Sequence, residues 1–277
     1  MITSERLYPI RRPLAAACAG ACVAILGGLI GLGGAEFRLP ILIAVFALYA
    51  HRAVRINLLI SLATLAMSAV ARLSFLGSTN AYDFRVEIVG LVAGGVTAAW
   101  IGAGLLSRIP KARLMSVIAL LLLVVAALLA AEPLWSHAQW SALGSSSALR
   151  PIVALVSGLA IGAISSLLGV AGGEFLIPTL VFLFGADIKT AGTASVLVSI
   201  PIVVTGVARH WRTGHYRSQS MLVYLALPMA IGSVVGAAIG GYLAAWAPTD
   251  AVRLMLAVIL ALSAVKLWSK SEAHQSN

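Results

Sequence analysis

Two glutamates, Glu36 and Glu174, are the side chains best placed to do chemistry. They are the only two of the nine Asp and Glu residues that fall well inside apolar stretches of the chain. An acid in such surroundings is costly and by default indicates a functional site. One interpretation is a proton-titrating or gating carboxylate beside a substrate path. The other is a carboxylate that caps its own short helix or pairs with Arg38. Both can hold, because a cap released by protonation would itself act as a gate.

A glycine-rich stretch precedes each glutamate, and a proline follows four residues after it. Glycine weakens a helix by about 1 kcal/mol relative to alanine, and proline is accommodated in a first helical turn. The pattern therefore predicts a helix stop, an unwound segment, and a new helix that begins near each glutamate with the proline in its first turn. Such a backbone is tolerated in a membrane only where it is buried in protein or lines a wet cavity. The new helix N-terminus favours an anion. The predicted substrate-binding glycines are Gly33, Gly34, Gly172 and Gly173.

Other polar residues could complete an anion site. Arg38 could bind an oxyanion through its planar guanidinium fork, or it could neutralise Glu36. Asn57, Thr193 and Ser195 could donate hydrogen bonds to an oxyanion, although ordinary packing between membrane helices would also explain them. Glu36 and Glu174 are the candidates for proton coupling.

The composition identifies the class of protein. Hydrophobic residues make up 61% of the 277 residues and charged residues 10%, and apolar runs near the ~20 residues that span a bilayer recur along the chain. The runs do not alternate as the strands of a membrane barrel would. The net charge of +10 is held in short gaps between the runs, so we expect lipid headgroups rather than nucleic acid as its partners. No metal-ligand pattern or enzyme motif is found, and no cofactor is expected. Cys18 and Cys22 share a helix face and are expected to be small packing residues.

The chain contains an internal repeat. The segments Gly31–Pro40 and Gly169–Pro178 share glycines, the glutamate, a phenylalanine and the proline at an offset of 138 residues, and further matches extend over most of each half. We expect a first membrane repeat at 1–131, a polar linker at 132–149 and a second repeat at 150–277. Each repeat has five apolar segments, the second of them short (about Phe37–Ala50 in the first repeat). The predicted fold is an all-α integral membrane protein with about ten transmembrane segments, broken or short near the midplane.

The distribution of Lys and Arg predicts the orientation. An odd number of crossings in each half turns the second half upside down relative to the first. With the N-terminus inside, the expected cytoplasmic segments are 1–13, 51–55, 108–113, 209–217 and the C-terminal tail, which hold 13 of the 19 Lys and Arg residues. This bias favours cytoplasmic N- and C-termini and two inverted repeats, a common transporter architecture.

The paired motif resembles a known family. Gly-x-Gly/Ala-Gly-x-Glu-Phe-x-x-Pro, present twice, together with Ala191–Ser195, is similar to the signatures of the sulfite exporter TauE/SafE family, over about Leu14 to Trp268. The resemblance implies transport of sulfite, sulfoacetate or other small organic anions across the bacterial inner membrane. Arg38 departs from the pattern, since the family is usually apolar there and the second half carries Leu176. A site symmetric in backbone and asymmetric in charge is therefore expected.

These features together predict a secondary transporter, an exporter by the resemblance, that works by alternating access. An anion channel or another non-coupled membrane protein is the alternative, since channels also use half-helices. A membrane-embedded enzyme is disfavoured. The sequence leaves open the substrate, the direction, the coupling ion and the oligomeric state, with a homodimer as one option.

Overall fold

The computed structural model describes residues 13–76, 79–105, 148–212 and 221–275, together with six single positions between 120 and 130. The elements in these residues are helical. In chain order they are α1 (Pro13–Ile30), α2 (Ala35–Ala44), α3 (Ala50–Leu76), α4 (Thr79–Tyr82), α5 (Arg85–Leu105), α7 (Arg150–Leu168), α8 (Gly173–Pro178), η5 (Thr179–Leu183), α9 (Ile188–Arg212), η6 (Leu222–Ala226), α11 (Leu227–Trp246) and α12 (Thr249–Gln275). Several parts of the chain lie outside the described residues. They are the linker up to residue 147, most of the fifth apolar segment, the expected cytoplasmic segment 108–113 and residues 213–217 of the expected cytoplasmic segment 209–217.

Four described helices are long and apolar enough to cross a membrane. They are Pro13–Ile30, Arg52–Leu76, Ile188–Arg212 and Leu222–Trp246. Shorter apolar helices are Arg150–Ser166 and Gly173–Leu183. The prediction of a helical membrane protein is confirmed at this level, whereas the ten-segment count stays a prediction.

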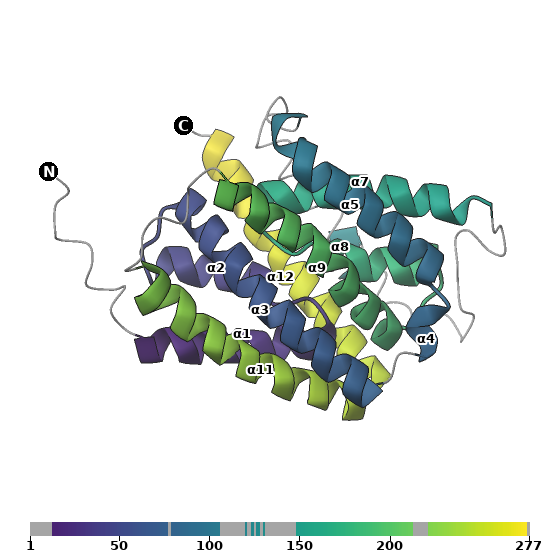
Figure 1. The fold of residues 1–277 in the computed structure, drawn as a ribbon, viewed down its shortest axis with the longest axis horizontal. Helices are drawn as coiled ribbons and strands as arrows, with labels where there is room; N and C mark the ends of the chain where they lie inside the picture. The colour runs from purple at the N-terminus through teal and green to yellow at the C-terminus, as the bar shows by residue number, and fades with distance from the viewer. Residues whose placement is uncertain are drawn as a thin grey trace, which may run out of the picture.

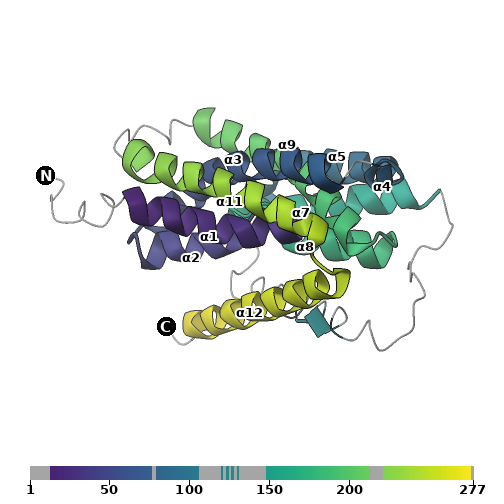
Figure 2. The ribbon, with the colours of Figure 1, turned by 90° about the horizontal axis from the view of Figure 1, so that it is seen from below.

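The helices pair closely in two places. α1 packs along α11, as both Figure 1 and Figure 2 show, and α5 packs along α7. Glycines make both approaches possible: a Cβ atom on Gly236 would strike the Ala21 carbonyl of α1, and one on Gly158 would strike the Leu91 carbonyl of α5. Close approach through small residues is a common way for membrane helices to pack.

Large apolar side chains point outward on several helices. Examples are Val89 on α5, Ile231 on α11 and Leu262 on α12, each more than half exposed. The interior, by contrast, contains fully buried polar residues on α3. An apolar exterior around a partly polar interior is the distribution expected of a protein whose solvent is lipid.

The backbone repeats at the 138-residue offset. Positive φ angles occur at Gly31 and Gly169, at Gly34 and Gly172, and at Ala47 and Gly185. Backbone hydrogen bonds repeat as well: Leu48 N–H donates to the Leu42 carbonyl, and Ala186 N–H donates to the Leu180 carbonyl. The two halves therefore share local conformation around each break.

Three predictions of local structure need correction. The short segment expected at about Phe37–Ala50 is the helix Ala35–Ala44, because the chain turns at Ala47 with a φ of 51°. Pro40 and Pro178 stand sixth in their helices rather than in the first turn. Proline at that place removes a helical N–H donor, and after Pro178 the helix continues in the wider π form as η5. Cys18 and Cys22 are free and exposed on α1 rather than packed between helices.

Candidate functional site

Both predicted helix breaks are present and have the same form. α1 ends at Ile30 and α2 begins at Ala35, while α7 ends at Leu168 and α8 begins at Gly173. The residue before each new helix is a left-handed glycine, Gly34 with φ 71° and Gly172 with φ 79°. Glycine adopts this conformation without the steric cost that a Cβ imposes. Each glutamate then occupies the second position of its new helix.

The two breaks lie against each other in the interior. A Cβ atom on Gly173 would be 3.0 Å from the Cα of Leu32, so the start of the second short helix touches the first break. Gly33 faces Ala171 of the second break, with its built Cβ 3.9 Å from the Ala171 Cβ. The carboxyl groups of Glu36 and Glu174 are close enough to interact electrostatically. The glycines and glutamates predicted for the site are therefore brought together.

Asn57, from α3, bridges the two breaks. Its Nδ2 donates to the carbonyl of Ala35 at 2.9 Å and to the carbonyl of Gly169 at 3.0 Å. The Gly169 carbonyl follows the last turn of α7, where a helix leaves its carbonyls without a backbone partner, and the Ala35 carbonyl lies at the start of α2. Asn57 is fully buried. One side chain thus satisfies backbone acceptors from both halves of the chain.

Arg38 is fully buried beside this bridge, and its hydrogen bonds go to neutral oxygens. Its guanidinium donates to Ser61 Oγ at 3.1 Å and Thr64 Oγ1 at 3.0 Å. Longer contacts reach the Gly33 carbonyl at 3.4 Å and Asn57 Oδ1 at 3.5 Å. Its Nε has no hydrogen-bond partner among the described residues.

The carboxyl group of Glu36 is near Arg38 but is not hydrogen-bonded to it. Its charge acts on the guanidinium, yet neither carboxyl oxygen has a hydrogen-bond partner among the described residues. The side chain does not cap its own helix either. In this conformation Glu36 therefore neither caps its helix nor forms a hydrogen-bonded ion pair with Arg38. It interacts with Arg38 only through its charge.

The hydroxyl residues of α9 divide between two places. Ser199, the repeat counterpart of Ser61, donates to the carbonyl of Ala171 at 2.9 Å and so belongs to the second break. Ser195 is fully buried, and its Oγ has no partner among the described residues. Thr193 contacts Arg72: its Oγ1 accepts a hydrogen bond from Arg72 Nε at 3.2 Å and donates to the Lys189 carbonyl at 3.1 Å. Its role in substrate binding stays a prediction.

Arg72 was missed as an interior residue, because its position near the end of an apolar run indicates a loop-facing cation. It is fully buried, and besides Thr193 it donates to the carbonyls of Gly28, Leu29 and Lys189 at 2.9, 3.0 and 2.9 Å. A signal was available in the helical spacing. Fully buried polar residues repeat every three or four positions along α3: Asn57, Ser61, Thr64, Ser68 and Arg72. Such spacing places them on one helix face.

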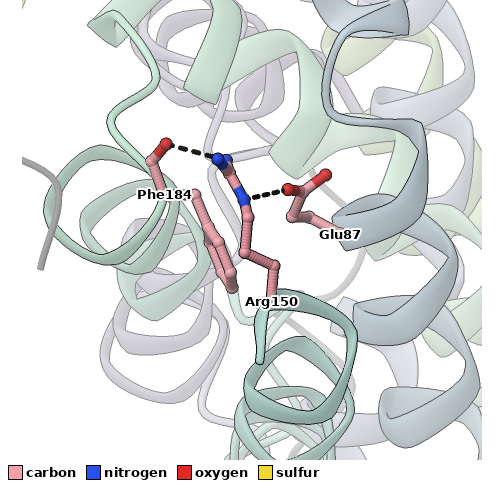
Figure 3. Close-up of polar contacts among 3 residues, drawn as sticks. All are labelled: Glu87, Arg150 and Phe184. Carbon is pink, nitrogen blue, oxygen red and sulfur yellow. Dashed lines mark hydrogen bonds and ion pairs between the residues drawn. The ribbon is translucent and has the colours of Figure 1, made fainter. Parts of the chain in front are cut away.

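The burial of a third acid is not apparent from the sequence. Glu87, in the first turn of α5, is 4% exposed and pairs with Arg150 at 2.6 Å. Figure 3 shows Arg150 between Glu87 and the carbonyl of Phe184, to which it donates at 3.1 Å, with its guanidinium 5.8 Å from the centre of the Phe184 ring. This cluster joins α5, α7 and the turn after η5. Its hydrogen bonds are internal, so we assign it to structure.

Comparisons with known proteins agree with this architecture. A family model described as "Sulfite exporter TauE/SafE" matches residues 16–271. The "Probable membrane transporter protein YdhB" of Bacillus subtilis (strain 168) is 26% identical over 223 residues, which cover 78% of this chain and 84% of that protein. The "Probable membrane transporter protein y4hK" of Sinorhizobium fredii (strain NBRC 101917 / NGR234) is 33% identical over 119 residues, 41% of this chain and 44% of that protein. No solved structure matches. The chain belongs to the sulfite exporter TauE/SafE family of membrane transporters.

Proposed function

We propose that this membrane transporter is a secondary carrier that exports sulfite or a small organosulfonate across the inner membrane. The observation that carries the proposal is Arg38, a fully buried guanidinium bonded to neutral oxygens where two helix breaks meet. A cation in an apolar interior is costly unless it is paired. An oxyanion bound between the breaks would supply a counter-charge that is hydrogen-bonded to the guanidinium, which the nearby Glu36 carboxyl group does not do.

The donors around Arg38 suit a small tetrahedral or pyramidal oxyanion. The hydroxyl group of Ser61 lies within hydrogen-bond distance of the guanidinium and can donate to an oxyanion, and the unpartnered Nε can donate one further bond. Glycines at both breaks let the backbone approach a ligand closely. Sulfite and short sulfonates, whose oxyanion group matches these donors, are therefore the favoured substrates.

Alternating access follows from a two-fold relation between the halves. An axis in the membrane plane would exchange α1 with α7 and α5 with α11. It would then carry the α1–α11 contact onto the α5–α7 contact, and both contacts are present. Together with the bias of Lys and Arg toward one side, this supports inverted repeats with both termini in the cytoplasm. Rocking of the halves about the paired breaks would expose the site to each side in turn.

The proposed substrate is tested by flux through purified protein in liposomes. Loaded sulfite should leave wild-type proteoliposomes with saturable kinetics, and Arg38→Leu, which copies the residue of the second half, should abolish most of this flux. Chloride and sulfate efflux measured in parallel check selectivity. Absence of sulfite and sulfoacetate flux under every imposed proton gradient would refute the proposed substrate. Flux that never saturates would instead favour an anion channel.

The glutamates are proposed to couple transport to protons. Two ionised carboxylates beside the site would repel an anion, so substrate entry requires that they be protonated or turned away. Glu36→Gln and Glu174→Gln mimic the protonated form, and each should flatten the dependence of sulfite flux on pH. The matched control is Glu87→Gln, because Glu87 is buried but paired with Arg150. Full pH dependence in both glutamine variants at the breaks would exclude proton coupling through these residues.

A further inference from the structure

A pocket of about 270 Å³ lies at the end of the molecule where α3 ends and α9 begins. It is large enough to hold a small hydrated anion. The polar side chains that line it are Asp187, Lys189, Thr190 and Thr193, and the apolar ones come from the end of α3, from α4 and from the end of α11. Lys189 supplies a positive charge and holds the α11 end by donating from Nζ to the Ala245 carbonyl at 3.3 Å.

Asp187, the acid among the described residues of the pocket lining, is already engaged in capping a helix. Oδ1 of Asp187 accepts the backbone N–H groups of Lys189 at 3.1 Å and Thr190 at 3.0 Å, as an N-cap residue does. The helix N-terminus is therefore not the anion-binding element here. The cations that face the pocket are Lys189 at its wall and Arg72 directly behind Thr193.

Arg72 connects the wall of this pocket to the end of α1, just before the first break. Its guanidinium ties the last turn of α1, at the Gly28 and Leu29 carbonyls, to the first turn of α9, at the Lys189 carbonyl and Thr193. These turns come from the two halves of the chain. Gly31, the first residue of the first break, also packs directly against this junction, because a Cβ on Gly31 would strike Gly192 of α9.

The bonds that Arg72 makes are the kind an arriving anion can replace. The hydrogen-bond partners of its guanidinium are neutral oxygens, and an oxyanion would add an opposite charge and two parallel hydrogen bonds, which single carbonyls cannot offer. Building on the proposed function, we infer that this pocket is an oxyanion-binding vestibule at one mouth of the permeation path, and that Arg72 is the gate between the vestibule and the breaks. An anion held by Lys189 draws the guanidinium away from the α1 carbonyls and frees the two halves to separate.

The repeat counterpart of Arg72 is a histidine. The repeat offset places His210 at the position that matches Arg72, near the other end of α9. A small cleft there is lined by Ser165, Ser166, Gly206, Arg209 and His210, and Ser165 donates to the Val170 carbonyl of the second break. Imidazole has two ring nitrogens and no fork, so it cannot tie three segments as a guanidinium does.

Thiol accessibility tests the gate without requiring transport. In a background with Cys18→Ser and Cys22→Ser, the reporter is Val196→Cys, because Val196 lies one turn beyond Thr193 and is buried with Ala35 and Ala171 of the breaks. The control is Ala245→Cys in the vestibule wall. The anionic, membrane-impermeant reagent methanethiosulfonate ethylsulfonate is applied to whichever membrane orientation labels the control.

The gate predicts a specific pattern of rates. Arg72→Gln should speed modification of the Val196 reporter at least about tenfold, and Arg72→Lys, which keeps the charge but loses the fork, should speed it less. Modification of the Ala245 control should stay within about twofold, which also shows that each variant is folded. An unchanged reporter rate in both variants with an unchanged control would overturn the gate, while sulfite flux would decide the proposed function separately.

Binding in the vestibule has its own readout. Millimolar sulfoacetate, which does not react with the thiol reagent, should slow modification of the Ala245 control severalfold. Lys189→Ala should abolish this protection, whereas Arg38→Leu should preserve it, because Arg38 lies at the breaks. Lack of protection in the wild-type vestibule, or protection that survives Lys189→Ala, would refute the anion-binding part of the inference.

Discussion

Asn57→Ala should destabilise the protein by about 1–3 kcal/mol. The substitution removes two hydrogen bonds of 2.9 and 3.0 Å and leaves the Ala35 and Gly169 carbonyls buried without that donor. A buried hydrogen bond contributes about 0.5–1.5 kcal/mol in soluble proteins and averages about 0.6 kcal/mol between membrane helices. The loss of two such bonds accounts for the lower part of the expected destabilisation, and the desolvation of two carbonyls that lose this donor accounts for the upper part.

The repeat supplies a matched control for this prediction. Ser195 occupies the same position in the second half and is equally buried, but its Oγ has no partner among the described residues. Ser195→Ala should therefore change stability by less than about 0.5 kcal/mol. SDS-induced unfolding in mixed micelles measures both variants against wild type. Equal losses in the two variants would contradict the view that Asn57 holds the breaks together through its amide.

Four further substitutions test the packing and the electrostatics. Gly192→Ala should cost about 1–3 kcal/mol in the same unfolding assay, since its Cβ would lie 2.6 Å from the Arg72 guanidinium, whereas Gly206→Ala, with its nearest neighbour at 3.6 Å, should be neutral or stabilising by up to about 1 kcal/mol. Glu87→Gln should cost about 1–2 kcal/mol, less than for a fully buried pair because a quarter of the Arg150 side chain is exposed; a loss below about 0.3 kcal/mol would show that the pair is not structural. Arg38→Lys should lower sulfite flux at least about tenfold, because an ammonium cannot reproduce the guanidinium fork, and undiminished flux would contradict the anion site.

The helix breaks could be predicted from the sequence because their causes are local. Glycine clusters stop a helix wherever they occur, and an acid in an apolar run has few structural explanations, so the segments around Glu36 and Glu174 were identified correctly. The roles of Pro40 and Pro178 were not, because a proline tolerated in a first turn is also tolerated where a helix widens or ends.

The positions of two cations, Arg72 and Lys189, could not be predicted from the sequence in the same way. Arg72 and Lys189 both follow or precede apolar runs, and charge statistics assign such residues to loops. Only the folded chain shows that the Arg72 guanidinium reaches inward to carbonyls more than forty residues away. Likewise, the partners of Arg38 on α3 depend on how α2 packs against α3, which no local pattern reveals.

The most direct test of the central claim is the position of a bound anion. Selenite is the heavier analogue of sulfite, and its anomalous scattering locates it in crystals of the protein. A site between the two breaks, within hydrogen-bond distance of Arg38 and absent in Arg38→Leu crystals, is the predicted result. Selenite that is transported by the protein but binds away from both breaks would contradict the claim that they form the substrate site.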